Sequence, residues 1–376
     1  MRKTGCPVDI KIFSKAELSE DLERLIADGK KTLFLITDSR IRAFGMEDSL
    51  SRWLKNPSVR HYAKIEPNPS IASLTEALNA VREFSPERII AFGGGSSIDT
   101  AKGLSALLPL GAGSFTEDFV REAISSKQYL GSAAACKILA VPTTAGSGSD
   151  VTHWATIWDP EHGRKLSVDK PELYPEASLL CAELQAGMPR RLTLSTGLDA
   201  LSHAMEAFWS RARNPESQQY AMDAVSGIAE DLPKVLDDPS NLSRREAMMM
   251  HALNAGIAFS STRTTACHSI SYPLTMRYGI EHGFACALSL FPVAKRNLAA
   301  VPEIQHLLEP FGGLEGFGVW LQVVSTGIQP LKLSSWNVPE TDLPRIAVDA
   351  FTKGRMDNNP IAFSEADVMG ILRESL

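Results

Sequence analysis

One carboxylate and three imidazoles, spread over the middle of the chain, are residue types that together bind a divalent transition metal. Asp199 and His203 are four residues apart, His268 follows, and His282 stands directly before Gly283. Side chains four residues apart on a helix project from one face, so Asp199 and His203 can reach the same ion. Imidazole and carboxylate ligands suit both Zn²⁺ and Fe²⁺. The sequence therefore predicts a metal site and leaves the choice of metal open.

Any one of these histidines, taken singly, would more often be a half-buried side chain with a hydrogen-bond partner. Four ligand-type residues at these spacings favour a metal instead. His268 and His282 are separated by fourteen positions that include Pro273 and Gly279, which predicts a helix, a turn and the start of a second helix. The other histidines lack partners at ligand spacing and are interpreted as surface or hydrogen-bonded residues: His61, His153, His162, His251 and His306.

A glycine-rich loop at residues 93–97 (GGGSS) follows a predicted strand and precedes a predicted helix. Glycines let the backbone approach a phosphate, and a helix N-terminus offers free N–H groups. The loop is neither GxGxxG nor a P-loop, so a tight turn without a ligand explains it equally well. Asp38, at the end of an earlier strand, would favour NAD over NADP by accepting bonds from a ribose, or it caps a helix. A metal beside a dinucleotide indicates hydride transfer at an alcohol or aldehyde carbon.

Composition excludes several other classes of protein. The 376 residues predict two domains, and 38 basic against 44 acidic residues give a net charge of −6, which argues against a nucleic-acid binder. The five cysteines are odd in number and widely spaced, and this pattern argues against a set of disulfides and against a thiolate zinc site. We see no apolar secretion signal after Met1 and no run long enough to span a bilayer, so we expect a cytoplasmic protein without membrane or nucleic-acid partners.

The elements that must position these residues change character along the chain. Helical patterns at 17–27, 73–84 and 99–108 alternate with strand patterns at 31–38, 88–92 and 137–142, which predicts a parallel sheet with helices on both faces. After a boundary placed between residues 178 and 190 the patterns are almost all helical. Ser195 and Thr196 are predicted to cap a helix that carries Leu198, and helices follow at 216–236, 244–262 and 283–298. We therefore expect an α/β domain over 1–182 and an all-helical domain over 183–376.

Several segments together resemble one known family. They are residues 93–102 (GGGSSIDTAK), 142–149 (PTTAGSGS) and 197–206 (GLDALSHAME), then His268 with 272–274 (YPL), and His282 with Gly283. In this order, over most of the chain, they resemble the iron-containing (group III, metal-dependent) alcohol dehydrogenases. The resemblance implies a Rossmann-like N-terminal domain and a helical C-terminal domain, as in dehydroquinate synthase. It also implies a homodimer, with metal and nicotinamide meeting in the cleft between the domains.

The same resemblance assigns individual residues. It implies a metal held by Asp199, His203, His268 and His282. It implies a pyrophosphate held by Gly94, Gly95, Ser96 and Asp99. Asp38 and Asn68 would lie on the adenosine side, and the rest of the cofactor would be lined by Thr143, Thr144, Ser147 and Lys165.

One position departs from the family pattern. Many members carry another histidine four residues after the third ligand, where it is thought to relay a proton, and here that position is Tyr272. A phenol can donate a hydrogen bond or relay a proton, but it is a poor base at neutral pH. Tyr272 therefore either takes part in proton transfer or only packs against Pro273 and shapes the pocket.

Residues 268–275 (HSISYPLT), with 358–360 (NNP), look like the branch that includes phosphonoacetaldehyde reductases. A phosphonate would need cationic partners, and the candidates nearby in sequence are Arg263, Arg277, Lys295 and Arg296. Each of them is alternatively a solvated helix residue.

We expect a metal-dependent, NAD(H)-linked alcohol dehydrogenase or aldehyde reductase with Fe²⁺ or Zn²⁺, acting on a small aldehyde or primary alcohol. In this interpretation the metal polarises the carbonyl for hydride transfer. Three alternatives stay open at this point. They are a dedicated phosphonoacetaldehyde reductase, a metal-dependent lyase of the dehydroquinate synthase type, and a non-catalytic nucleotide sensor.

Overall fold

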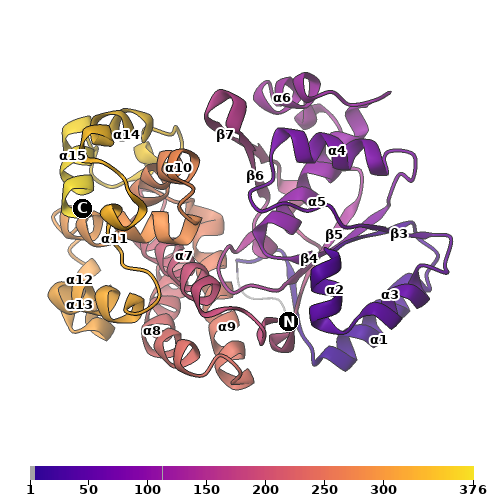
Figure 1. Cartoon of the computed structure of the whole chain (residues 1–376), viewed down its shortest axis with the longest axis horizontal. Coiled ribbons are helices and arrows are strands. Elements are labelled where there is room, and N and C mark those ends of the chain that lie inside the picture. The colour runs from indigo at the N-terminus through magenta and orange to yellow at the C-terminus, as the bar shows by residue number, and fades with distance from the viewer. Residues whose placement is uncertain (1–4, 112) are drawn as a thin grey trace. The chain divides into compact units, whose positions relative to one another are not determined.

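The chain forms two compact units in the computed structural model, which describes residues 5–111 and 113–376 (Figure 1). The first unit comprises the chain up to Thr144 together with Ser149–Gly187, and the second comprises Ala145–Gly148 together with Met188–Leu376. The segment that separates the two parts of the first unit therefore packs with the helical part of the chain.

A six-stranded sheet, with the strand order β1-β8-β5-β4-β2-β3, forms the centre of the first unit, and every neighbouring pair in it is parallel. The strands are β1 (Asp9–Ile12), β2 (Thr32–Leu35), β3 (Val59–Tyr62), β4 (Arg88–Gly93), β5 (Lys137–Pro142) and β8 (Ala177–Leu180). The predicted parallel sheet is confirmed, with the strands expected at 31–38, 88–92 and 137–142 found as β2, β4 and β5.

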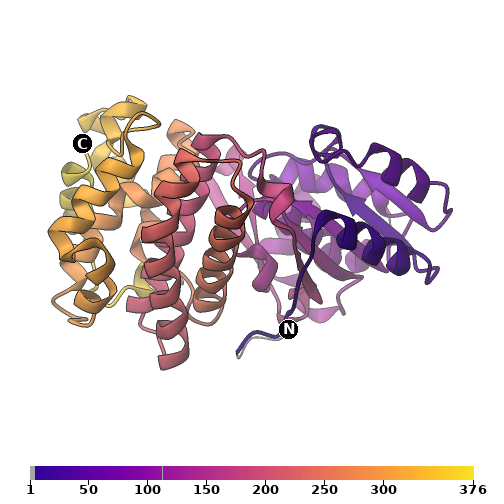
Figure 2. The ribbon, with the colours of Figure 1, turned by 90° about the horizontal axis from the view of Figure 1, so that it is seen from below.

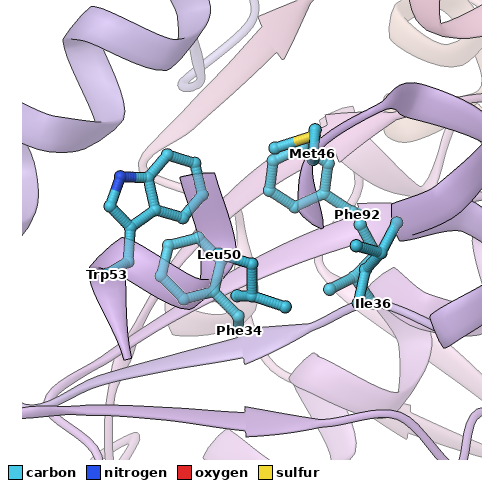
Figure 3. A pocket seen from close by; sticks show the side chains of 7 residues that line it. Phe34, Ile36, Met46, Leu50, Trp53 and Phe92 are labelled. Atoms are coloured by element: carbon cyan, nitrogen blue, oxygen red, sulfur yellow. The ribbon is translucent and has the colours of Figure 1, made fainter. Parts of the chain in front are cut away.

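Helices cover both faces of this sheet (Figure 1). One face packs against α1 (Lys15–Ile26), α2 (Asp38–Phe44) and α3 (Glu47–Trp53), and the other against α4 (Ile71–Val81), α5 (Gly95–Leu107) and α6 (Glu117–Ser125). Successive side chains of a strand point to opposite faces, so Phe34 packs in the apolar cluster with α1, α2 and α3, and Leu33 packs in the one with α4, α5 and α6. Figure 3 shows part of the cluster that contains Phe34, where Trp53 of α3 stacks on Phe34 of β2 with ring centroids 5.1 Å apart.

The order of the strands places a switch point between β2 and β4. From β2 the chain moves outward to β3, whereas from β4 it moves the opposite way to β5. In open parallel sheets, ligands bind beyond the carboxyl ends of the strands at such a point.

The first unit also contains an antiparallel hairpin of β6 (Trp154–Asp159) and β7 (Arg164–Asp169). The sequence patterns did not predict this hairpin.

Two predicted helix starts are wrong. The helix expected at 99–108 is α5, which begins at Gly95 because Gly94, inside the glycine loop, is its N-cap. The helix expected to be capped by Ser195 and Thr196 is α7 (Arg190–Trp209), whose N-cap is Pro189. Thr196 lies inside α7, where its hydroxyl donates to Leu192 O at 2.9 Å, so it is satisfied without capping.

The second unit is helical, and its long helices lie side by side (Figure 2). After α7 come α8 (Pro215–Asp237), α9 (Leu242–Thr262), α10 (Ala266–Tyr278), α11 (His282–Asn297), α12 (Ile304–Leu307), α13 (Gly313–Ser325), α14 (Leu343–Asp349) and α15 (Glu365–Glu374). The helices expected at 216–236, 244–262 and 283–298 are α8, α9 and α11. Within the described part of the chain, none of the helices is apolar over a length that would cross a membrane.

Candidate metal centre

The four predicted metal ligands converge at one point in the second unit. Asp199 and His203 lie one turn apart on α7, His268 lies on α10, and His282 is the first residue of α11. Asp199 Oδ1 is 3.8 Å from His203 Nε2, 3.7 Å from His268 Nε2 and 3.8 Å from His282 Nε2. The structure therefore brings together three nitrogens and one oxygen from three helices.

These distances fit a shared cation. Two atoms that each lie about 2.1 Å from one ion are within about 4.2 Å of each other, and each imidazole nitrogen meets this limit with respect to Asp199 Oδ1. They are also too long for hydrogen bonds. Asp199 Oδ1 is buried and has no hydrogen-bond partner, an arrangement that costs free energy unless another group satisfies the oxygen. A divalent cation between these four atoms would satisfy it.

The electrostatics of the cluster fit the same ion. Burial, together with the nearby charge of Glu206, raises the pKa of the Asp199 carboxyl to about 7. Burial also holds the pKa of His203 well below its ordinary value, and charge on His268 and His282 would lower it further. Imidazole binds metals in its neutral form, and a cation stabilises the ionised carboxylate, so the donor set suits a divalent metal.

Glu206 supports this centre, although residue spacing did not predict it as a site residue. The side chain is fully buried, and its Oε1 accepts from the backbone N–H of Thr265 at 2.9 Å and of Cys267 at 2.8 Å. Its Oε2 accepts from His268 Nδ1. A carboxylate bonded to Nδ1 of a metal-binding histidine fixes the tautomer and leaves Nε2 free to bind. The only sequence signal was the position of Glu206 within the segment 197–206.

Backbone and ring contacts orient the remaining imidazoles. His203 Nδ1 lies 3.3 Å from Gly146 O, and the His203 ring stacks on Phe259 with centroids 4.1 Å apart. Tyr272 is 6% exposed, and its ring is parallel to the His282 ring with centroids 6.2 Å apart. Tyr272 thus packs beside a candidate ligand, and its part in proton transfer stays a prediction.

A thiol also lies beside the four predicted ligands. Cys286, one helical turn after His282, has its Sγ 3.9 Å from His282 Nε2. Its sulfur belongs to a group of ligand-type atoms, with those of Asp199, His268 and His282, that all lie within 4.8 Å of one another. Spacings between cysteines could not reveal it, because its partners are histidines and a carboxylate.

The glycine loop occupies the carboxyl end of β4 in the first unit. Gly94 caps α5, and a Cβ at Gly94 would lie 2.9 Å from Thr144 Oγ1. Asn68, at a left-handed φ of 56°, donates its N–H to Ser96 Oγ at 3.2 Å. Residues that follow β3, β4 and β5 are thus neighbours at one edge of the sheet, the edge that binds ligands in such folds. Asp38 is exposed in the first turn of α2, directly beyond β2.

The other residues expected around the cofactor differ from one another in their contacts and in the unit to which they belong. Both oxygens of Asp99 already accept hydrogen bonds, from Ser149 Oγ at 2.5 Å and from Thr156 N at 2.9 Å, so this carboxylate fastens the segment after β5 to α5. Lys165 on β7 lies close enough for its charge to act on the pKa of Asp99. Thr143 accepts from Arg40, while Ser147 belongs to the second unit. Their contacts with a cofactor stay predictions.

The remaining histidines have local partners, as predicted. His61 Nε2 donates to Ile36 O at 2.6 Å, His153 Nδ1 is 3.0 Å from Asp169 Oδ1, and His251 Nε2 is 3.0 Å from Asp231 Oδ2. His162 pairs with Asp159, and His306 pairs with Glu309. Asp159, Glu161 and His162 form a second acidic cluster, but arginines neutralise it, since Arg121 contacts both carboxylates.

Comparison with known proteins covers both units. A family model described as iron-containing alcohol dehydrogenase matches residues 10–181, and one described as the C-terminal part of the Fe-containing alcohol dehydrogenase family matches residues 193–376. The phosphonoacetaldehyde reductase of Streptomyces viridochromogenes is 36% identical over 77% of this chain and 76% of its own length. The 1,3-propanediol dehydrogenase of Klebsiella pneumoniae is 30% identical over 98% of this chain and 97% of its own. The solved structure of sulfoacetaldehyde reductase from Bifidobacterium kashiwanohense, in complex with NAD⁺, has a TM-score of 0.85 at 25% identity, over 100% of this chain and 98% of its own.

Proposed function

The chain belongs to the iron-containing alcohol dehydrogenase family, and we propose that it interconverts a small aldehyde and its primary alcohol with NAD(H). The observation that carries this proposal is the set of three imidazole nitrogens 3.7 to 3.8 Å from one buried, unpaired carboxylate oxygen. In this proposal Asp199, His203, His268 and His282 hold Fe²⁺, or Zn²⁺ in its place. Such an ion would supply the Lewis acidity that polarises a carbonyl, and the dinucleotide would supply the hydride.

The chain's own residues would orient the ligands of this centre and exclude water from it. Glu206 keeps His268 in one tautomer by accepting from its Nδ1, and the Gly146 carbonyl does the same for His203. Phe259 covers one face of the His203 ring. Tyr272, beside His282, is the candidate to pass a proton to or from the substrate oxygen.

For the first unit we propose the dinucleotide site that the sequence suggested. The pyrophosphate would lie on the N-terminus of α5, where Gly94, Gly95 and Ser96 present backbone N–H groups beside Thr144. Asp38, exposed beyond β2, would accept from the adenosine ribose and favour NAD over NADP. The further contacts proposed are those of Asn68, Asp99, Thr143, Ser147 and Lys165. The first unit would thus be the NAD-binding domain and the second the metal-binding domain.

Two wider features complete the proposal. We infer a homodimer in the cytoplasm, because the five cysteines are buried and form no disulfide, as is usual in a reducing environment. Light scattering on purified protein measures the oligomeric state directly. A narrower substrate, phosphonoacetaldehyde, is supported by the 36% identity to a phosphonoacetaldehyde reductase.

The test combines metal analysis with turnover. Protein loaded with Fe²⁺ or with Zn²⁺ is given NADH or NADPH and a panel of short aldehydes, and loss of reduced cofactor is followed. Asp199→Ala and His268→Ala should each lose most of the bound metal and the activity with it. His306→Ala, whose side chain is 68% exposed, is the matched control and should keep both. A wild-type protein that binds metal yet reduces none of the aldehydes contradicts the proposal, and a preference for NADPH contradicts the role of Asp38.

A further inference from the structure

Arg40 carries a positive charge that no carboxylate of the described residues neutralises. It lies in the first turn of α2, two residues after Asp38, and its side chain is half-buried. Burial lowers the pKa of Arg40 from its ordinary value, and no neighbouring acid raises it again. A cation in the first turn of a helix also opposes the helix dipole. A partly desolvated guanidinium in this position costs free energy, which an anionic ligand would recover.

The contacts of Arg40 take its guanidinium to the glycine loop. Its Nη1 donates to the hydroxyl of Thr143, which is its one hydrogen bond within residues 5–111 and 113–376. Arg40 follows β2 and Thr143 follows β5, whereas β4 lies between these two strands. Neighbouring strands are about 4.8 Å apart, so the side chain reaches over the carboxyl end of β4 to make this bond. Thr143 is held at that place, because its N–H donates to Gly93 O at 2.9 Å.

The glycine loop itself offers a diphosphate only neutral donors. They are the backbone N–H groups at the N-terminus of α5, which the helix leaves without partners. The one cation of α5 is Lys102, which is buried and donates to Ser149 O at 2.7 Å and to Trp154 O at 2.9 Å. A pyrophosphate is anionic at both phosphates, and charge-assisted hydrogen bonds are roughly twice as strong as neutral ones. Arg40 is placed to supply such bonds at the loop.

The direction of the Arg40 side chain decides which phosphate of a dinucleotide it can meet. The adenosine ribose is proposed to lie beside Asp38, beyond β2, where the 2′-phosphate of NADP would also lie. The Arg40 guanidinium is instead bonded to Thr143, beyond β5, with the end of β4 between these two places. This direction favours the pyrophosphate, which NAD and NADP share, over the 2′-phosphate.

We propose that Arg40 binds the pyrophosphate of the dinucleotide from the side opposite to the glycine loop. A guanidinium presents a planar fork of N–H donors that matches phosphate oxygens. Nε and Nη2 of Arg40 make no hydrogen bond with the described residues and are not enclosed, so phosphate oxygens can reach them while Nη1 keeps its bond to Thr143. This inference rests on the proposed dinucleotide site and adds a charged residue to it.

The experiment measures binding of NADH and NADPH to the metal-loaded enzyme by titration. Arg40→Gln keeps an N–H donor for Thr143 and removes the charge. It should weaken both dinucleotides by about tenfold or more, the loss expected for a hydrogen bond to a charged group, and by the same factor for each. Arg40→Lys, which keeps the charge without the fork, should recover part of the affinity. Arg42→Gln, which removes an exposed cation from the same helix, is the control and should bind both like the wild type.

Inorganic pyrophosphate tests the same contact without the nucleosides. It should compete with NADH in the wild type and in Arg42→Gln, and clearly more weakly in Arg40→Gln. In turnover with an aldehyde, Arg40→Gln should raise KM for NADH and leave kcat at saturating NADH close to that of the wild type, because the pyrophosphate is remote from the reacting carbon.

The outcomes separate this inference from the proposed function. A wild type that binds neither dinucleotide contradicts the proposed function itself. If the wild type binds NADH and Arg40→Gln binds it equally well, the dinucleotide site stands and the role of Arg40 is wrong. A loss confined to NADPH would assign Arg40 to the 2′-phosphate and overturn the contact with the pyrophosphate.

Discussion

At the scale of single residues, Glu206 links α7 and α10, the two helices that carry three of the four candidate ligands. It starts from α7, three residues after His203, and reaches the N-terminus of α10. There it accepts from the N–H groups of Thr265 and Cys267, which the helix itself leaves without partners, and from His268 Nδ1. Thr265, the N-cap of α10, makes no side-chain capping bond of its own, so a carboxylate from another helix takes that place.

Glu206→Gln should weaken metal binding while the four ligands stay in place. The amide has one acceptor instead of two and no charge, so it cannot serve both the helix N-terminus and His268 Nδ1 as the carboxylate does. Loss of such a partner lowers metal affinity by about 10- to 100-fold. Competition with a chelator of known affinity measures the change. Glu230→Gln, which removes an exposed partner of Lys234 on α8, is the matched control and should bind metal like the wild type. Equal affinities of all three proteins would show that Glu206 only caps α10.

At the scale of elements, the crossing of α7 and α11 depends on a glycine. A Cβ on Gly283 would lie 1.8 Å from Ser195 O and 2.7 Å from Ser195 C, which are backbone atoms of α7 that no rotamer change can move. Gly283 directly follows His282, so the close approach of the two backbones also sets the position of that imidazole. The pair His282-Gly283 thus combines a candidate ligand with the residue that allows α11 to approach α7 closely.

Gly283→Ala should force α11 away from α7. Overpacking of this kind costs about 1–3 kcal/mol, and because the obstacle is backbone we expect the upper part of that range. Urea unfolding of the metal-free protein measures the loss, and metal titration should show weaker binding because His282 moves with the helix. Gly131→Ala, where a Cβ would meet no atom within 4 Å, is the control and should change neither quantity. A stable Gly283→Ala variant with wild-type metal affinity would refute this account of the crossing.

The sequence predicted the parts of the fold and the site that rest on local spacing. Period and position revealed β2, β4 and β5, and the interval from Asp199 to His203 placed two candidate ligands on one helix face. The start of α7 was missed because Ser195 and Thr196 are good capping residues that here bond or pack inside the helix. Glu206 and Cys286 were missed because they meet groups that lie far away in sequence on other helices, where no spacing rule reaches.

At the scale of the whole molecule, the two units should respond to different ligands. The candidate metal ligands all belong to the second unit, whereas the glycine loop and Asp38 belong to the first. A ligand stabilises the folded state it binds, by about 2.7 kcal/mol at one hundred times its dissociation constant, and it slows the local opening that hydrogen exchange reports. Binding of the metal and binding of the dinucleotide should therefore slow hydrogen exchange in different units of the same protein.

Hydrogen exchange on the metal-free and cofactor-free protein, then with each ligand alone, should show this separation. Zn²⁺ should slow exchange at the N-terminal turns of α10 and α11, where Glu206 and the ligands hold the backbone, and Asp199→Ala should abolish the effect. NAD⁺ should slow exchange in the loop at 93–97 and the first turn of α5, and Asp199→Ala should keep that protection because Asp199 lies in the other unit. Protection of the glycine loop by Zn²⁺ alone, or loss of the NAD⁺ effect in Asp199→Ala, would show that the two sites are not assigned to separate units as proposed.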